Sequence, residues 1–163
     1  MSDPVAAKDE DDPLLLDRQV CFPLYAATNL LNRLYGPVLA ELDLTYPQYL
    51  VMLVLWEHET QTVGALGARL YLDSGTLSPL LKRMEATGLV ERRRDPADER
   101  RVLVGITAQG RALRASAEHV PETIGGGYAP DGIEELRESV RGLVAILAQR
   151  DGRASPLLPR TRR

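Results

Sequence analysis

The part of the chain that decides its fold is residues 73–106, which read DSGTLSPLLKRMEATGLVERRRDPADERRVLVGI. Helix-starting residues stand at Asp73 and Ser74, apolar residues follow at helical spacing, and Gly88 is typical of a helix end. Two strand-prone runs then flank a polar turn over residues 95–99. The pattern predicts a short helix followed directly by a β-hairpin with a charged tip.

A second short helix is expected just before this stretch. Thr62 is a candidate N-cap for a helix through Arg69, which puts two short helices in tandem, as in a helix-turn-helix. The added hairpin gives the winged-helix layout, in which one helix enters the major groove of DNA and the hairpin tip reaches a minor groove. The alternative is a solvated charged hairpin beside two ordinary surface helices.

Helices are expected on both sides of this unit. Apolar residues recur at helical spacing over residues 14–34, where Pro23 should kink or interrupt the helix and Gly36 with Pro37 should end it. Thr45 and Gln48 form a capping-box pattern before an apolar, central helix through Trp56. Further along, a helix should run from Thr107 to about His119, and residues 133–147 are amphipathic after a break at Pro121 and residues 125–127.

The expected fold class is therefore mainly α with a small β-hairpin wing. We expect an acidic, disordered leader over residues 1–12, one domain over 13–149 and a flexible basic tail over 150–163. Within the domain, the winged helix-turn-helix should span about 45–106. The flanking helices, about 13–36 and 107–149, are predicted to form a dimer interface.

Composition restricts the function. The 163 residues carry a net charge of −3, but residues 69–111 hold nine basic and six acidic residues, so a DNA-binding surface is possible where those residues lie. No apolar run has the length of a membrane helix, which predicts a cytoplasmic protein. His58 and His119 lack metal-ligand spacing and no cofactor motif is present, so we expect neither an enzyme nor a bound cofactor or metal.

The candidate DNA-contacting residues are small and polar at the start of the second short helix and basic further along. On the hairpin, Arg100 is suited to a narrow minor groove, and Asp98 to fixing that arginine or the turn. The full set is Ser74, Thr76, Ser78, Pro79, Lys82, Arg83, Arg94, Asp98 and Arg100.

Cys21 is the only cysteine, so an internal disulfide is excluded. A lone cysteine in an apolar helix is by default a small buried residue. The residues near Cys21 in sequence favour a reactive cysteine instead, because Phe22 and several tyrosines are close and tyrosine hydroxyls can hydrogen-bond a thiolate. Tyr35 follows Cys21 by fourteen residues, about 21 Å along one continuous helix. Contact between Tyr35 and Cys21 therefore requires a partner subunit or a helix that folds back. The alternative is that the tyrosines line a dimer core and do not contact the sulfur.

The run LDSGTLSPLLKRME from Leu72 to Glu85 and the hairpin from Asp95 to Arg101 resemble the MarR family of repressors. The run LDRQVCF from Leu16 to Phe22 is similar to the organic hydroperoxide repressors of that family. The resemblance implies a homodimer in which Cys21 is the peroxidatic cysteine, Phe22 adjoins it, and Tyr35 and Tyr46 reach the sulfur from the other subunit. One branch of these repressors has a second cysteine in the region that corresponds to residues 122–127. This chain has none there, so it resembles the one-cysteine branch.

The expected function is a repressor that binds operator DNA while Cys21 is reduced and leaves it on oxidation by organic hydroperoxides, with a low-molecular-weight thiol as second redox partner. The runner-up is a repressor relieved by a reversible phenolic ligand. A thiol peroxidase would need its thiol regenerated in every cycle, and the chain supplies no resolving cysteine. A purely architectural DNA binder would show no operator preference.

Overall fold

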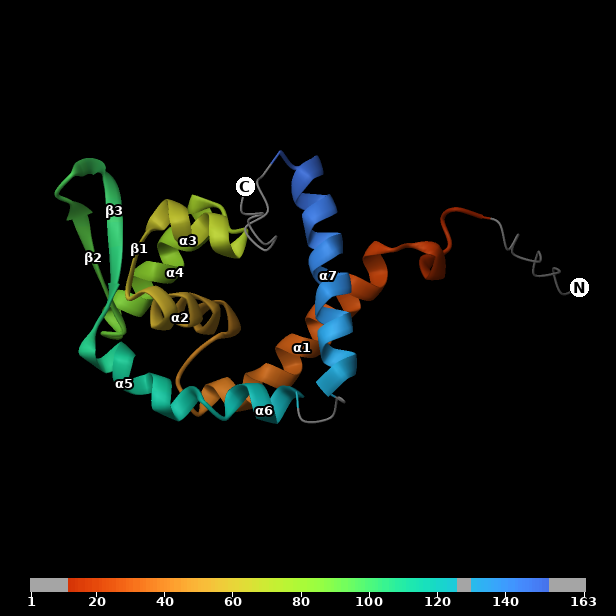
Figure 1. The fold of residues 1–163 in the computed structure, drawn as a ribbon, viewed down its shortest axis with the longest axis horizontal. Coiled ribbons are helices and arrows are strands. Elements are labelled where there is room, and N and C mark those ends of the chain that lie inside the picture. Colours follow the sequence, from red (N-terminus) through yellow and green to blue (C-terminus); the bar gives the residue numbers. More distant parts are fainter. Residues whose placement is uncertain (1–11, 126–129, 153–163) are drawn as a thin grey trace, which may run out of the picture.

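The computed structural model describes residues 12–125 and 130–152. A short 3₁₀ turn, η1 (Leu16–Arg18), precedes the helices and strands (Figure 1). The helices are α1 (Cys21–Ala40), α2 (Tyr46–His58), α3 (Val63–Leu70), α4 (Ser74–Ala86), α5 (Ala108–Ala117), α6 (Val120–Gly125) and α7 (Pro130–Arg150). The strands are β1 (Thr60–Thr62), β2 (Val90–Asp95) and β3 (Asp98–Ile106). The mainly helical fold with a small hairpin is confirmed.

The three strands form one antiparallel sheet in the order β1-β3-β2. The β2–β3 hairpin extends away from the helices (Figure 1). The turn predicted over residues 95–99 is shorter, because β3 already begins at Asp98, which pairs with Asp95 across a register irregularity. β1 was not predicted, since three polar residues carry no strand pattern and pair only because β3 lies beside them.

Side-chain caps set the helix starts of the winged unit as predicted. Thr62 accepts a hydrogen bond from the Ala65 N–H at 3.0 Å, and Asp73 accepts one from the Thr76 N–H at 2.8 Å. At the start of α2, the Thr45 N–H donates to Gln48 Oε1 at 2.8 Å. These bonds satisfy backbone donors that have no partner within their own helix.

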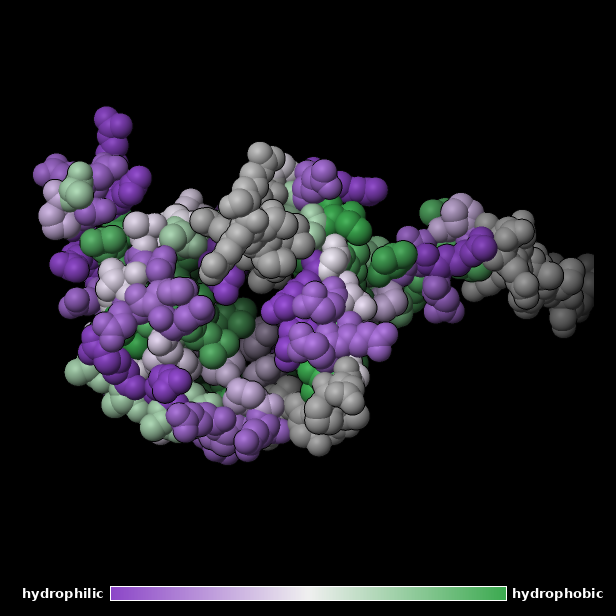
Figure 2. All heavy atoms as spheres, viewed as in Figure 1, coloured by the Kyte–Doolittle hydropathy of each residue, from purple (hydrophilic) through white to green (hydrophobic). Residues whose placement is uncertain are grey.

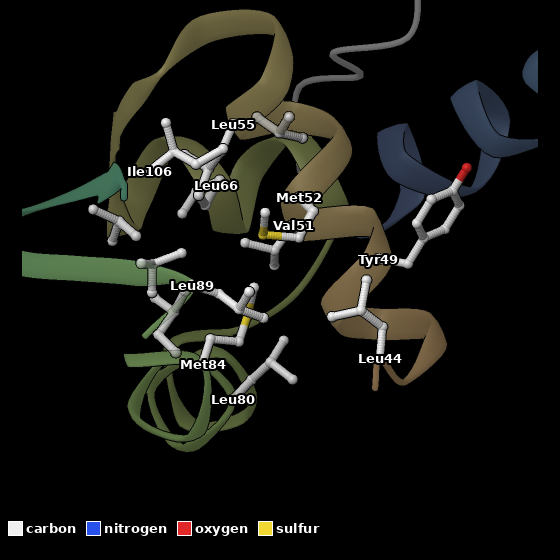
Figure 3. Packing of buried hydrophobic residues seen from close by; sticks show 14 of the residues in the cluster. Leu44, Tyr49, Val51, Met52, Leu55, Leu66, Leu80, Met84, Leu89 and Ile106 are labelled. Atoms are coloured by element: carbon white, nitrogen blue, oxygen red, sulfur yellow. The ribbon is translucent and has the colours of Figure 1, made fainter. Parts of the chain in front are cut away.

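Helix α2 is the centre of the core. Val51, Met52 and Leu55 have no exposed surface, and Figure 3 shows them between the apolar side chains of α3, α4 and the sheet. Tyr49 is 3% exposed and directs its hydroxyl away from this cluster. The prediction of a central, buried second helix is confirmed.

The prediction for the first long helix was wrong at both ends. The helix begins at Cys21 rather than near Leu14, so Pro23 lies in its first turn, where the missing N–H breaks no helical hydrogen bond and causes no kink. Gly36 and Pro37 do not end it, and it continues to Ala40. Packing of Leu39, which is 1% exposed, against the core compensates for the hydrogen bond that Pro37 cannot donate.

The chain after the hairpin also departs from the expected break. Thr107 caps α5 as predicted, accepting from the Gly110 N–H at 3.0 Å, but Pro121 stands in the first turn of another helix, α6. Gly126 and Gly127 lie outside the described residues. Helix α7 is longer than the predicted 133–147 span, and both predicted tails fall largely on residues 1–11 and 153–163, which are not described.

Apolar side chains remain exposed on the two longest helices. Figure 2 shows green, apolar surface on the upper part of α7 and on the neighbouring part of α1, beside purple surface over the lower part of α7. On α1 these residues are Tyr25, Leu30, Leu31 and Leu34, and on α7 they are Leu136, Val140, Ile146 and Leu147. Extended apolar surface of this kind marks an interaction site. None of the helices described is long and apolar enough to cross a membrane.

Gly110 provides a test of the packing between α5 and the sheet. A Cβ atom built on Gly110 would overlap the Leu89 carbonyl oxygen and lie 2.9 Å from Ile106 Cγ1. We expect Gly110→Ala to lower the free energy of unfolding by about 3 kcal/mol, because backbone limits relaxation there. The measurement is urea unfolding followed by circular dichroism.

The matched control is Gly64→Ala in α3, where the nearest atom to the new Cβ is Thr62 Oγ1 at 4.0 Å. Its free energy of unfolding should stay the same or rise by up to about 1 kcal/mol, because alanine favours helix over glycine. Equal effects of the two substitutions would contradict the close approach at Gly110.

Candidate functional site

Helix α4 has one buried and one exposed face. Leu77, Leu80, Leu81 and Met84 pack into the core. The opposite face carries all six predicted contact residues of this helix in exposed positions: Ser74, Thr76, Ser78, Pro79, Lys82 and Arg83. The exposed face is therefore small and polar near the helix start and positive near its end, as a surface that approaches DNA closely requires.

Asp73 fixes the start of this helix. In addition to the backbone bond, Thr76 Oγ1 donates to Asp73 Oδ2 at 3.0 Å. The hydrogen bonds from the Thr76 N–H and then the Thr76 hydroxyl lower the pKa of Asp73 below its usual 3.8. The Thr76 proton is thus used in the cap, which leaves the oxygen lone pairs and the methyl group for other contacts.

The hairpin tip is held by its own side chains. Asp98 Oδ1 accepts from the Arg100 N–H at 3.1 Å, and Asp98 Oδ2 pairs with Arg101 Nε at 3.3 Å. Arg94 Nη1 donates across the hairpin to the Glu99 carbonyl oxygen at 2.9 Å. Asp98 and Arg94 therefore shape the turn, whereas the exposed Arg100 side chain has no hydrogen bond or ion pair to any described residue.

An open groove joins the hairpin to the helices. It lies between the beginning of α3, the exposed face of α4 and β3, and both Ser78 and Arg100 line it. The groove thus connects the predicted helix residue Ser78 with the predicted hairpin residue Arg100. The winged-helix layout expected from the sequence joined these two features, but the groove between them was not predicted.

Arg92 is among the basic residues of this region that bind other parts of the protein. Arg92 was counted toward the positive balance, but its guanidinium is paired with Glu85 at the end of α4, with 2.7 Å between Nη2 and Oε2. The two residues are seven positions apart in different elements, so no helical or strand periodicity predicts their contact. The only signal was their opposite charge on either side of Gly88.

The predicted thiol residues fall into two separate groups. Cys21 is the first residue of α1 and is exposed, with Phe22 half-buried beside it. Tyr35 lies on the same unbroken helix, about 21 Å further along. There its ring contacts Tyr46 of α2, with 4.6 Å between ring centroids. Within one chain, the structure brings the two tyrosines together and keeps them away from Cys21.

The tyrosine cluster extends into the core through Tyr49, whose ring centroid is 6.1 Å from that of Tyr35. Burial raises the pKa of Tyr35, and the nearby Tyr46 and Tyr49 raise it further. Burial also raises the pKa of Tyr46 and of Tyr49. All three phenols therefore keep their protons at neutral pH and act as hydrogen-bond donors.

No metal site is formed by the residues that the structure describes, where no group of three or more His, Cys, Asp or Glu side chains comes together. His58 lies 3.4 Å from Glu57, and His119 lies 3.9 Å from Glu41. The two histidines are in different parts of the surface.

A helix-turn-helix, a basic hairpin and a connecting groove define the class of winged-helix transcriptional regulators. A family model described as "Transcriptional regulator SarA/Rot" matches residues 33–116. Solved MarR-type regulators at 23–24% identity share the fold. The chain belongs to the family of transcriptional regulators that the family model describes, and it is similar to a transcriptional regulator of organic hydroperoxide resistance.

Three relatives carry the comparison. The organic hydroperoxide resistance transcriptional regulator of Bacillus subtilis is 45% identical, over 86% of this chain and 97% of its own. The regulator TtmR of Methylorubrum extorquens is 54% identical over 71% of this chain, and the match spans only 60% of TtmR. Reduced AbfR of Staphylococcus epidermidis, solved bound to DNA, is 35% identical with a TM-score of 0.67, over 81% of this chain and 93% of its own.

The Asp73 cap gives a pH-dependent prediction. Because its folded pKa is lowered, the Asp73 carboxylate stabilises the folded state above pH 3.8, and this contribution is lost as the pH falls through the folded pKa. We expect Asp73→Ala to lower the free energy of unfolding at pH 7. Asp73→Asn should lower it less, because asparagine is also an N-cap.

The measurement is urea unfolding of the parent and Asp73→Asn over a series of pH values. The difference between them should be largest at neutral pH and shrink as the pH falls below 3.8. A difference that is constant over this range would mean that the carboxylate charge has no part in the cap.

Proposed function

We propose that this protein is a redox-sensing repressor that binds operator DNA as a homodimer while Cys21 is reduced and dissociates when an organic hydroperoxide oxidises Cys21. The carrying observation is that Cys21 and Tyr35 lie on one unbroken helix, about 21 Å apart along its axis. A thiol site that contains both needs two subunits, so oxidation of the thiol acts directly on the dimer interface.

A second copy of the chain is the proposed occupant of the apolar surface on α1 and α7. In a two-fold dimer the same surface serves both subunits, so two apolar faces cover each other. If the two α1 helices pass each other in opposite directions, Cys21 of one subunit approaches the partner subunit's Tyr35 and Tyr46. This arrangement supplies protonated phenols to the thiolate and closes the site with Phe22.

The proposed chemistry has two balanced steps. The Cys21 thiolate attacks the peroxide oxygen that carries hydrogen, and the O–O bond breaks. The products are a Cys21 sulfenic acid and an alkoxide, which takes a proton from water to become the alcohol, so sulfur is oxidised by two electrons and the peroxide is reduced. A low-molecular-weight thiol then attacks the sulfenic sulfur, forming a mixed disulfide and releasing water. The described residues hold no second cysteine to take this role.

We attribute release from DNA to the bulk of the mixed disulfide. AbfR has been solved bound to DNA in an overoxidised form as well as in the reduced form, and separately with a disulfide formed. By analogy, added oxygen atoms alone are insufficient here. An adduct between α1 and the partner's tyrosines would force the interface to repack and move the two α4 helices from the spacing of one DNA turn, about 34 Å.

In the DNA complex we place the exposed face of α4 in the major groove and Arg100 in an adjacent minor groove. Ser74, Thr76, Ser78 and Pro79 allow close approach, while Lys82 and Arg83 supply positive charge. Asp98 and Arg94 contribute by holding the hairpin tip rather than by reading bases. This role places the protein in the cytoplasm with its operator and requires neither a cofactor nor enzymatic turnover.

The direct test is a DNA titration with the reduced protein, using a duplex selected from a random library and fluorescence anisotropy. One equivalent of cumene hydroperoxide with a small thiol should lower the affinity of the parent protein for the duplex by about a hundredfold or more. This is the ratio expected between specific and non-specific binding. Cys21→Ser should bind the same duplex and keep its affinity after oxidant.

Release of Cys21→Ser by the oxidant would contradict the thiol mechanism. Unchanged affinity of both proteins would return Cys21 to a packing role and favour a repressor relieved by a reversible phenolic ligand. A protein without preference for any duplex would instead be an architectural binder.

The composite site predicts complementation between subunits. Tyr35→Phe homodimers should lose DNA about tenfold more slowly after hydroperoxide, because one hydrogen bond to the thiolate is missing. A mixed dimer of one Cys21→Ser and one Tyr35→Phe subunit should instead react at the parent rate. In this dimer the remaining Cys21 meets the intact Tyr35 of the other subunit.

The measurement is stopped-flow anisotropy on mixed dimers purified through two different affinity tags. Cys21→Ser homodimers are the control for release that does not depend on the thiol. A mixed dimer as slow as the Tyr35→Phe homodimer would show that Tyr35 does not act across the interface.

A further inference from the structure

We propose that Glu85 and Arg92 form a strut that sets the hairpin at a fixed position relative to α4, so that Arg92 supports DNA binding without touching DNA. This inference rests on the proposed function, because the strut matters only if α4 and the hairpin engage one duplex together. Glu85 and Arg92 are then positioning residues, and Lys82, Arg83 and Arg100 remain the contacting ones.

The strut consists of three hydrogen bonds between two elements. Glu85 Oε2 accepts from Arg92 Nε at 2.9 Å and from Arg92 Nη2 at 2.7 Å. Glu85 Oε1 accepts from the Arg92 backbone N–H at 3.0 Å. One carboxylate therefore holds both the guanidinium and the main chain of β2, which fixes the strand more firmly than a side-chain pair alone.

Burial and charge support a structural role for this pair. The Arg92 side chain is 30% exposed and the Glu85 side chain 36%, so water only partly competes with the bonds. The hydrogen bond from Arg92 lowers the pKa of Glu85, which keeps the carboxylate charged at neutral pH. Arg92 and Arg100 line the same groove, but the charge of Arg92 is matched by Glu85, whereas the exposed Arg100 side chain has no such partner among the described residues.

The Glu85–Arg92 pair lies where it can set the orientation of the hairpin tip. Arg92 pairs in register with Val104, near the base of the hairpin, whereas Arg94 and Arg100 lie further toward the tip. Among the strands of the described residues, β1 is the only other one that supports the hairpin, and it pairs with residues 103–105 of β3 and not with β2. Glu85 is therefore the side-chain link between β2 and the helix that is proposed to enter the major groove.

The proposed role predicts that removing the negative charge of Glu85 lowers the affinity for DNA. Removing a negative charge from a DNA-binding surface normally raises affinity, because phosphate repulsion falls. Glu85→Gln should instead weaken binding of the reduced protein to its selected duplex by about tenfold, the effect of losing one charge-assisted contact. The matched control is Glu99→Gln on the hairpin, because the Glu99 side chain makes no bond to a described residue. The DNA affinity of this variant should stay equal or rise.

The pair should also behave as a unit. If Arg92 acts only through Glu85, then Arg92→Ala and the double variant Glu85→Gln with Arg92→Ala should bind DNA equally, although each single change weakens binding. If Arg92 contacts phosphate, its loss should weaken binding further in the Glu85→Gln background and reduce the slope of affinity against salt by about one. That result would overturn the proposal.

A second measurement tests the strut without DNA. Spin labels are attached to Ala86→Cys on α4 and Ala97→Cys at the hairpin tip in the Cys21→Ser background, and their separation is measured by pulsed electron resonance. A narrow distance distribution that broadens with Glu85→Gln but not with Glu99→Gln is expected. An unchanged distribution in Glu85→Gln together with unchanged or higher DNA affinity would overturn the strut. If the parent binds no DNA but Glu85→Gln still broadens the distribution, only the proposed function is refuted.

Discussion

The burial of α2 is the constraint on which the rest of the structure depends. This helix is apolar on nearly every side, with Val51, Met52 and Leu55 fully buried, so other elements must cover most of it. Helices α1, α3, α4 and α5 and strands β1 and β3 all contact it. The Trp56 indole N–H donates to the Gly110 carbonyl oxygen at 2.9 Å and fixes α5 to α2 at the same time. A single central helix thereby sets where the DNA-facing elements and the long outer helices lie.

The same helix connects the two proposed activities. Tyr46 and Tyr49 on α2 meet Tyr35 on α1, and Tyr49 in turn lies against Trp56, with 6.3 Å between ring centroids. A repacking of the α1 tyrosines around an oxidised partner thiol would therefore act on the helix that carries the whole winged unit. Because cores are densely packed, such a change favours a rigid displacement of one unit against the other over a gradual deformation.

The proposed DNA surface owes its shape to contacts that do not face DNA. Asp73 fixes the start of α4, Asp98 fixes the hairpin turn, and Glu85 ties β2 to the end of α4. Three acidic residues on a surface proposed for an anionic ligand are accounted for by bonds within the protein. They hold in place the backbone that carries exposed cations such as Lys82 and Arg100, and this preorganisation reduces the conformational entropy lost on binding.

The sequence by itself determined the local features: the capped starts of α2, α3, α4 and α5, the end of α4 before Gly88, the hairpin, and the exposed positions on α4. These follow from hydrogen bonds and side-chain periodicity within a few residues. Only the tertiary structure decided that α1 starts at Cys21 and runs through Pro37, that β1 joins the sheet, and that Glu85 binds Arg92. Each of these depends on a neighbour distant in sequence: core packing against Leu39, the free edge of β3, and the approach of β2 to α4. Local propensity carries no information about such contacts, because their energy exists only after the chain has folded.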